Sequence, residues 1–326
     1  MEATSKRSLL GWIETHKSQF GAYFGLIFCL VFFSIVPPFF GKSIWAQAKL
    51  ETLISSVIVL ALLSVGSVFV YSLGNMDVSL GKQVGLYATI IVVLGNKTGS
   101  LIPGILVSLI IAVFIGTLNA ATGQLLHIHP VVASVVFMMV LRGINSAIYV
   151  SLGTRNNALT AVDHHLFKEP WFMILALMIE ILVITYLFNR TKYGKYARAI
   201  GANANAAEQS GISLLKYKII PYIIAGCCMV LASLFQMGAT GSASDSTGTG
   251  FEMNVIVALV LGGMPLNGGM RSKVSCAVVG SFTYGLLTVG LPLIGLKANQ
   301  VFIIKAIIFL VVVLITCRKK NGTLPR

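Results

Sequence analysis

Long apolar runs recur along almost the whole chain and limit its fold more than any other feature. A helix needs about 20 mostly apolar residues to cross the hydrocarbon core of a bilayer, and lipid offers no partner to an unpaired backbone group. Ten runs lie near residues 20–40, 52–73, 84–95, 101–122, 131–152, 170–188, 218–239, 252–264, 273–291 and 299–317. The sequence therefore predicts an all-α integral membrane protein with about ten transmembrane helices.

Two of these runs are too short to cross a bilayer untilted. They cover residues 84–95 and 252–264, and each lies beside a glycine-rich segment. We expect short or broken helices there, in the form of half-helices or re-entrant segments.

The composition agrees with a protein whose surface faces lipid. Only 10% of the 326 residues are charged and 56% are hydrophobic, whereas a soluble domain has roughly 25% charged residues. A net charge of +14 would suggest nucleic acid in a soluble protein, but these basic residues lie mainly between and beyond the apolar runs. The five cysteines lie inside the runs or at the end of one, without a CxxC pair, so no disulfide framework or zinc site is predicted.

The basic residues predict how the chain is oriented. With the N-terminus in the cytoplasm and ten spans, 16 Lys and Arg residues fall in cytoplasmic segments, 6 in outside segments and 2 inside spans. Short cytoplasmic loops carry an excess of Lys and Arg, so the count predicts an N-in, C-in topology. The six outside residues are Lys42, Lys49, Lys97, Arg155, Lys168 and Lys297.

We expect one transmembrane domain with a short segment on either side. Residues 1–19 would form a cytoplasmic N-terminal segment, residues 20–317 the membrane domain and residues 318–326 a basic cytoplasmic tail. The first apolar run is expected to remain as the first span, because its charged preface is long and no small-residue cleavage pattern follows it.

The longest hydrophilic connection, residues 189–217, is cytoplasmic in this topology. Asn203 can cap the start of a short helix, and Gly211 stands where a C′ glycine would end it. A short, moderately polar helix suits a docking surface for a cytoplasmic partner. On local evidence alone, an ordinary basic loop against lipid headgroups is the alternative.

Two glycine-rich segments interrupt the apolar runs. Residues 74–81 read GNMDVSLG, and residues 262–269 read GGMPLNGG. Glycines permit helix breaks and close helix–helix approach. Asp77 is a carboxylate at or near membrane depth, where charged groups are usually paired or functional. A role as N-cap for the amides that start at Val78 is favoured over contact with a substrate or ion.

Five further polar residues fall inside the apolar runs: Asn119, Arg142, Asn145, Glu180 and Lys305. Arg142 and Asn145 are three residues apart and so share one helix face. Together with Asn119 they are candidates for lining an aqueous path for a hydroxylated solute. Alternatively, Arg142 extends to the membrane interface or pairs with Glu180.

The sequence contains no recognisable enzyme active site. Residues 41–43 have the GKS tail of a P-loop, but Val36 occupies the first glycine position and the segment follows a membrane span. His127 and His129 lack the further ligands that a zinc site needs. We therefore expect no catalytic residue, no metal and no cofactor, and any ATP hydrolysis on a separate partner subunit.

Four motifs, in this order along the chain, resemble those of one transporter family. Residues 74–81 resemble the G-G-I-D-L-S-V-G signature of the ribose/galactose/xylose-type permeases of ATP-binding-cassette importers. Residues 190–203 and 210–212 resemble their R-T-x-x-G…A-(I/L)-G-x-N and S-G-I stretch. Residues 248–252 resemble G-x-G-(Y/F)-E, and residues 262–269 resemble the G-G-T-S-L-x-G-G signature.

The chain departs from this pattern at two places. Asn75 replaces the second glycine of the first signature, and Met264-Pro265 replaces a Thr-Ser pair in the second. Pro265 would stiffen that turn and remove one amide donor. These differences leave the identity of the solute open.

The resemblance implies a permease subunit that forms the translocation path for a small hydroxylated solute, above all a monosaccharide such as a pentose or hexose. It implies ATP-driven alternating access in a bacterial cytoplasmic membrane. The implied partners are cytoplasmic ATP-binding-cassette ATPase subunits, an extracytoplasmic solute-binding protein, and a second permease copy or homologue. Residues 203–210 would then contact the ATPase.

The motifs supply the candidate site residues. The signature and gating candidates are Gly74, Asp77, Ser79, Gly81, Gly262, Gly263, Asn267, Gly268 and Gly269. The ATPase-coupling candidates are Gly201, Asn203, Ala206, Glu208 and Gly211. A permease of the same family for nucleosides or a furanosyl autoinducer remains an alternative. An ATP-independent secondary transporter or channel is a further one, and so is an intramembrane enzyme, which the lack of grouped catalytic residues disfavours.

Overall fold

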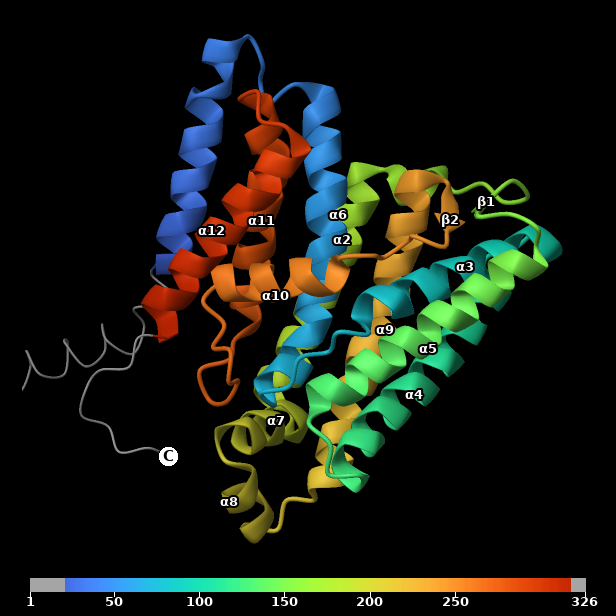
Figure 1. Ribbon diagram of the computed structural model, residues 1–326, viewed down its shortest axis with the longest axis vertical. Helices are drawn as coiled ribbons and strands as arrows, with labels where there is room; N and C mark the ends of the chain where they lie inside the picture. The colour runs from blue at the N-terminus through green and yellow to red at the C-terminus, as the bar shows by residue number, and fades with distance from the viewer. Residues whose placement is uncertain (1–20, 318–326) are drawn as a thin grey trace, which may run out of the picture.

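The structure, a computed structural model, describes residues 21–317, and most of these residues are helical (Figure 1). The first helix includes residues 21–35. The later helices are η1 (Pro37–Phe40), α2 (Gln47–Ser72), α3 (Leu80–Thr98), α4 (Ile102–Leu125), α5 (Pro130–Ser151), η2 (His165–Lys168), α6 (Pro170–Arg190), α7 (Lys192–Ala202), α8 (Ala204–Gln209), α9 (Leu214–Thr240), α10 (Phe251–Leu261), α11 (Val274–Leu293) and α12 (Ala298–Cys317). The predicted cytoplasmic segments 1–19 and 318–326 lie outside the described residues.

The helices follow the apolar runs, and the chain is an all-α integral membrane protein. Within residues 21–317, seven helices are long and apolar enough to cross a membrane. α10 has only 11 residues, which confirms the short helix expected at 252–264. It lies across the long helices instead of alongside them (Figure 1).

At residues 84–95, where a half-helix or re-entrant segment was expected, α3 is longer than its apolar run but is not among the seven candidate spans of the described residues. It has 19 residues and begins four residues earlier, at Leu80. Lys82 Nζ in its first turn donates to Thr249 Oγ1 at 2.7 Å, and Gln83 is buried among hydrogen-bond partners. The run underestimated the helix because the fold satisfies polar side chains that hydropathy alone counts against a span.

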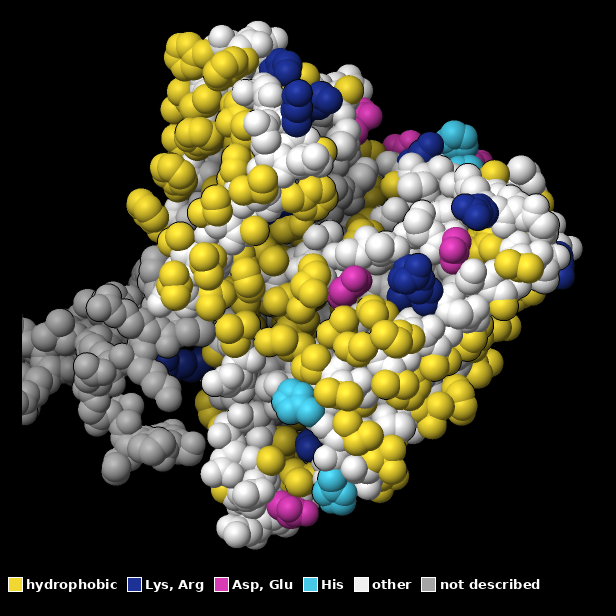
Figure 2. Space-filling model, in the orientation of Figure 1, with side chains coloured by type: hydrophobic (Ala, Val, Ile, Leu, Met, Phe, Trp, Pro, Cys, Tyr) yellow, Lys and Arg dark blue, Asp and Glu magenta, His cyan; other side chains and the backbone are white. Residues whose placement is uncertain are grey.

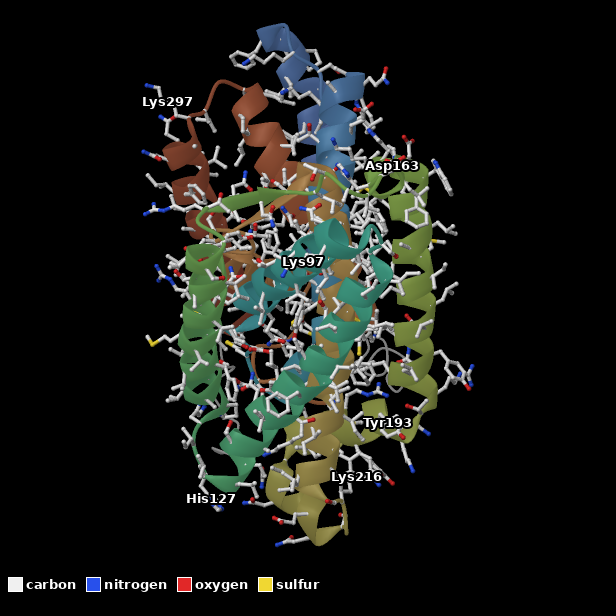
Figure 3. All side chains as sticks on the ribbon, turned by 90° about the vertical axis from the view of Figure 1, so that its right-hand side faces the viewer. Lys97, His127, Asp163, Tyr193, Lys216 and Lys297 are labelled. Carbon is white, nitrogen blue, oxygen red and sulfur yellow. The ribbon has the colours of Figure 1, made fainter. Side chains whose placement is uncertain are left out.

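Segments predicted on the same side of the membrane gather at the same end of the molecule. The connection from η1 to α2 and the connection from α11 to α12 lie at the upper end of Figure 1, whereas α7 and α8 lie at the lower end. Figure 3 shows Lys297 and Asp163 towards the first end and His127, Tyr193 and Lys216 at the other. This separation agrees with the alternation on which the predicted topology rests.

α2 forms the centre of the bundle. Every residue from Val57 to Ser72 is buried, and this part of the chain packs among α6, α9 and α11. In contrast, α4, α5 and α6 expose large apolar side chains such as Ile110, Met139 and Leu182. Figure 2 shows hydrophobic side chains along the first helix and along α4. Apolar side chains that point outward from long helices face lipid in a membrane protein.

A small two-stranded sheet fixes the segment that leads into α10. β1 (Asn156–Ala158) and β2 (Ser242–Ser244) pair antiparallel, with Asn157 opposite Ala243. Asn96, in the last turn of α3, donates from Nδ2 to the last carbonyl of β1 at 2.7 Å. The sheet therefore ties the upper end of α3 to the loop before α10.

Candidate functional site

The two glycine-rich segments meet at the lower end of α2. Gly269 N donates to Ser72 O at 2.8 Å. Gly74 has a φ of 78°, and a Cβ there would lie only 2.9 Å from Asn267 O. A Cβ at Gly268 would overlap the backbone at the end of α2. Only glycine permits contacts this close between two backbones, so the segments 74–81 and 262–269 pack as one unit.

The end of α7 enters the same contact. A Cβ at Gly201 would overlap Ser72 O and would lie 2.9 Å from Gly269 N. The connection predicted to contact an ATPase therefore touches the second glycine-rich segment and the end of α2, which leads into the first. We refer to Gly74, Gly201, Gly268 and Gly269 as the glycine junction.

A second close contact joins the start of α3 to the start of α10. A Cβ at Gly81 would overlap both the Gly248 carbonyl oxygen and Glu252 Oε2, and a Cβ at Gly248 would overlap Gly81 O. Glu252 lies in the first turn of α10, where a carboxylate interacts favourably with the helix dipole. The motif 248–252 thus packs directly on the first glycine-rich segment.

Glycines also hold α10 against α11. A Cβ at Gly262 would overlap the Cys276 carbonyl oxygen, and a Cβ at Gly280 would overlap that of Ala258. Gly263 follows with a φ of 84°, and its amide donates to Val260 O at 2.9 Å. The chain can therefore turn sharply out of α10 while the helix stays in backbone contact with α11.

A buried polar cluster lies where α3 begins. Asp77 is 2% exposed, and its Oδ1 accepts from Ser79 N at 2.9 Å and from Ser79 Oγ at 2.5 Å. Gln83 Nε2 donates to Asp77 Oδ2 at 3.3 Å, and Asn119 Nδ2 donates to Oδ1 at 3.4 Å. Tyr87 Oη donates to Gln83 Oε1 at 3.0 Å. We call these five residues the Asp77 cluster.

The N-cap role predicted for Asp77 is wrong. α3 begins at Leu80, and its N-cap is Ser79, whose side chain makes no capping bond. The Val78 amide donates instead to Ser134 Oγ of α5 at 3.1 Å. Because the Asp77 carboxylate bonds Ser79 two residues later, it closes the turn before the helix and ties that turn to α4.

The structure separates the residues predicted to line a path. Asn119 and Asn145 are each 2% exposed, whereas Arg142 is exposed. Asn119 belongs to the Asp77 cluster, and Asn145 lies against α3 with its Oδ1 unpaired. Glu180 is buried beside Cys228, whereas Arg142 is exposed, and among the described residues no ion pair joins the two. The path role of these three residues stays a prediction.

The cytoplasmic connection contains the short helix that the sequence predicted. Asn203 Oδ1 accepts from Ala206 N at 3.1 Å, which confirms its N-cap role for α8. Gly211 has a φ of 82°, and its amide donates to Glu208 O at 2.9 Å, as expected for the glycine that ends a helix. Ala206 and Glu208 are exposed on this helix. The contact of these residues with an ATPase stays a prediction.

A polar chain between α10, α11 and α12 was not predicted as a unit. Lys305 Nζ donates to Tyr284 Oη at 3.0 Å, and Tyr284 Oη donates to Asn254 Oδ1 at 2.5 Å. Lys305 is 9% exposed and lies 4.4 Å from the centre of the Tyr284 ring. A lysine inside an apolar run was the visible signal, but its partners lie on two other helices.

The long helices face lipid, the two glycine-rich segments that interrupt them pack together, and the connection through α7 and α8 is exposed. These features define a polytopic membrane permease. The sequence profile of the family described as branched-chain amino acid transport system / permease component matches residues 49–313. The chain belongs to this family. It is a multi-pass protein of the bacterial cytoplasmic membrane.

Several curated bacterial permeases are similar to this chain over nearly their whole length. The ribose import permease protein RbsC of Escherichia coli (strain K12) is 28% identical over 320 residues, which cover 95% of both chains. The galactose/methyl galactoside import permease protein MglC of Salmonella typhimurium is 28% identical over 329 residues, 94% of both. RbsC of Bacillus subtilis is 26% identical over 317 residues, 93% of this chain and 94% of that one. No solved structure matches the chain.

Proposed function

We propose that the chain is the permease subunit of an ATP-binding-cassette importer for a monosaccharide, with pentoses and hexoses as the first candidates. The relatives named ribose and galactose/methyl galactoside import permeases support this solute class. The subunit itself is not an enzyme. In this proposal cytoplasmic ATPase subunits, an extracytoplasmic solute-binding protein and a second permease copy or homologue complete the assembly.

The glycine junction is the observation that carries this proposal. It places Gly201, at the end of α7, against Ser72 O and Gly269 N with no side chain between them. α8 follows α7 after Asn203 alone and is exposed at Ala206 and Glu208. A force applied to α8 is therefore passed through backbone contacts to the end of α2 and to the second glycine-rich segment.

The proposed mechanism is alternating access driven through this junction. An ATPase that moves α8 shifts the junction, and the turns before α3 and after α10 move with it. Those two turns belong to the glycine-rich segments 74–81 and 262–269, which interrupt the regular helices. Irregular backbone is tolerated at membrane depth where it is buried in protein. Coupling of this kind is mechanical and needs few titratable groups in the membrane.

Reconstituted transport tests the proposal. The chain is placed in proteoliposomes with its cognate ATPase and solute-binding proteins, and uptake of labelled ribose, galactose and a nucleoside is measured. We expect sugar uptake that needs both ATP on the cytoplasmic face and the binding protein. Uptake at full rate without nucleotide would show a secondary transporter or channel instead. Nucleoside uptake in place of sugar uptake would change the solute class alone.

The coupling helix can be tested separately with Ala206→Pro. Proline removes the Ala206 amide that donates to Asn203 Oδ1 and disfavours helical backbone at Asn205 before it, so it weakens the N-terminal turn of α8. We expect membrane insertion to be normal and solute uptake to fall at least tenfold while ATP hydrolysis continues. Ala206→Ser, which keeps the amide, is the matched control. Normal uptake by the proline variant would refute the assignment of α8 as the coupling helix.

A further inference from the structure

A pocket of about 610 Å³ with both apolar and polar lining residues opens at the upper end of the molecule, between the η1–α2 connection, the first turns of α2 and the last turns of α11. We call it the outer pocket. Its polar lining residues are Lys42, Ser43, Lys49, Thr52, Ser56 and Thr288. No member of the glycine junction or of the Asp77 cluster lines it, so it is separate from the machinery proposed above.

The charges around the outer pocket favour an anion. Lys42 and Lys49 line it, and no carboxylate does. Glu51 lies two residues after Lys49, which places it on the opposite side of α2, and its Oε1 accepts from Gln47 Nε2 at 3.2 Å. Lys305, which is buried and does not line the pocket, donates to the lining residue Thr288 through its Oγ1 at 3.4 Å. Three cations therefore converge on this region. Figure 2 shows Lys and Arg side chains gathered at this end of the molecule.

The hydroxyl groups of the pocket are available as acceptors. Thr52 Oγ1 donates to Ala48 O at 2.8 Å, and Ser56 Oγ donates to Thr52 O at 2.9 Å. Thr288 Oγ1 donates to Tyr284 O at 2.8 Å. Because these protons are used within the helices, the lone pairs of Thr52 and Ser56 remain for a ligand. A matching ligand carries an anionic group and also hydroxyl donors.

The surroundings place the outer pocket at the level of the lipid headgroups. Phe39, Phe40 and Trp45, in and just after η1, are 83%, 58% and 57% exposed. Exposed aromatic side chains at the end of a membrane helix mark the boundary between hydrocarbon and water. The pocket also has an apolar wall that includes Val289 and Leu293 of α11, which suits the glycerol and acyl part of a lipid.

We propose that the outer pocket binds the phosphoglycerol headgroup of an anionic phospholipid from the outer leaflet of the cytoplasmic membrane. The phosphate lies between the ammonium groups of Lys42 and Lys49. The headgroup hydroxyls donate to Thr52 and Ser56. A choline or ethanolamine headgroup fits poorly, because its own cation would approach the two lysines.

Native mass spectrometry of the purified full chain in detergent tests this site. Phosphatidylglycerol and phosphatidylcholine of the same acyl length are titrated, and the bound fraction is measured. We expect preferential binding of phosphatidylglycerol, reduced roughly 25-fold by the double variant Lys42→Gln/Lys49→Gln, because each lysine contributes about a factor of five near an anionic headgroup. The matched control, Lys97→Gln/Lys297→Gln, removes two exposed lysines of the same predicted side that do not line the pocket.

Three results would overturn the proposal: equal binding of the two lipids, equal loss in both double variants, or unchanged binding in the pocket variant. Two further arms define the ligand chemistry. Glycerol 3-phosphate, added as a soluble headgroup, should not displace the lipid at micromolar concentration if the apolar wall contributes, and displacement there would refute a lipid site. Thr52→Val/Ser56→Ala should reduce binding of phosphatidylglycerol but not of phosphatidic acid, which lacks the headgroup hydroxyls. An equal reduction for both would refute the hydroxyl contacts.

Discussion

The two helices beside the glycine signatures, α3 and α10, are held in place by different chemistry. At the start of α3, side chains hold the turn: Asp77 accepts from Ser79, Gln83 and Asn119. At α10, backbones hold the helix, because Gly262 and Gly280 bring it against α11 with no space for a Cβ. Both elements adjoin the glycine junction, so both can respond to a movement of α7.

This difference predicts how each helix responds to substitution. A network of side chains has intermediate forms, since one donor or acceptor can be replaced while the others stay. A contact between two backbones has none, because any side chain forces the helices apart. We therefore expect α10 to be rigidly seated against α11 and the turn before α3 to be adjustable by degrees.

Gly280→Leu should have the largest effect. Its side chain would collide with the Ala258 carbonyl of α10, and overpacking of this kind exceeds the usual cost of about 1–3 kcal/mol when backbone must move. We expect a loss of about 4 kcal/mol or more in stability and no solute uptake, measured by thermal unfolding in detergent and by reconstituted transport. Gly143→Leu is the matched control, since a Cβ there meets nothing within 4 Å. Equal behaviour of the two variants would remove the distinction between α10 and α3.

Asp77→Ala should have the next largest effect. It leaves the amide and the hydroxyl of Ser79 without their acceptor in a buried cluster, whereas Gln83 and Asn119 keep Ser79 Oγ as an acceptor. Each unpaired buried group costs about 1–3 kcal/mol. Partial relaxation of the turn should limit the loss to about 3 kcal/mol. Asp77→Asn keeps one acceptor oxygen and should lie between the wild type and alanine, measured by the same thermal unfolding. If asparagine were as damaging as alanine, the network would not be adjustable.

Tyr284→Phe should have a moderate effect on stability and uptake, because it weakens the packing of α10. It removes the hydroxyl that joins Asn254 to Lys305 without changing the glycine contacts. We expect a loss of about 1–2 kcal/mol and a partial loss of uptake, because Asn254 Oδ1 loses this donor and Lys305 keeps Thr288 Oγ1 as an acceptor. Tyr186→Phe, at an exposed position on α6, is the control and should change neither quantity. A loss as large as that of Gly280→Leu would show that side chains, not backbone, hold α10.

The parts of the fold that depend on near neighbours in the sequence were predictable. The helix lengths follow the apolar runs at α10, and the caps of α8 lie three residues from the groups that they bond. The role of Asp77 was not predictable, because its partner Asn119 lies 42 residues away on another helix. Likewise, the early start of α3 depends on Lys82 and Thr249, which are 167 residues apart. Motif order indicated the two glycine-rich segments, but not that Gly201 would contact Gly269.

Arg142→Gln should have the smallest effect, and it sharpens the contrast between side chains that face inward and outward. Arg142 and Asn145 lie three residues apart on α5, yet Arg142 is exposed while Asn145 is buried against α3 with a free Oδ1. Exposed substitutions usually change stability by less than about 0.5 kcal/mol, so we expect uptake within twofold of the wild type. Asn145→Leu should instead raise the KM for the solute if its free oxygen meets hydroxyl groups during transport. A large loss of uptake in Arg142→Gln with none in Asn145→Leu would reverse this assignment and place the path on the outer face of α5.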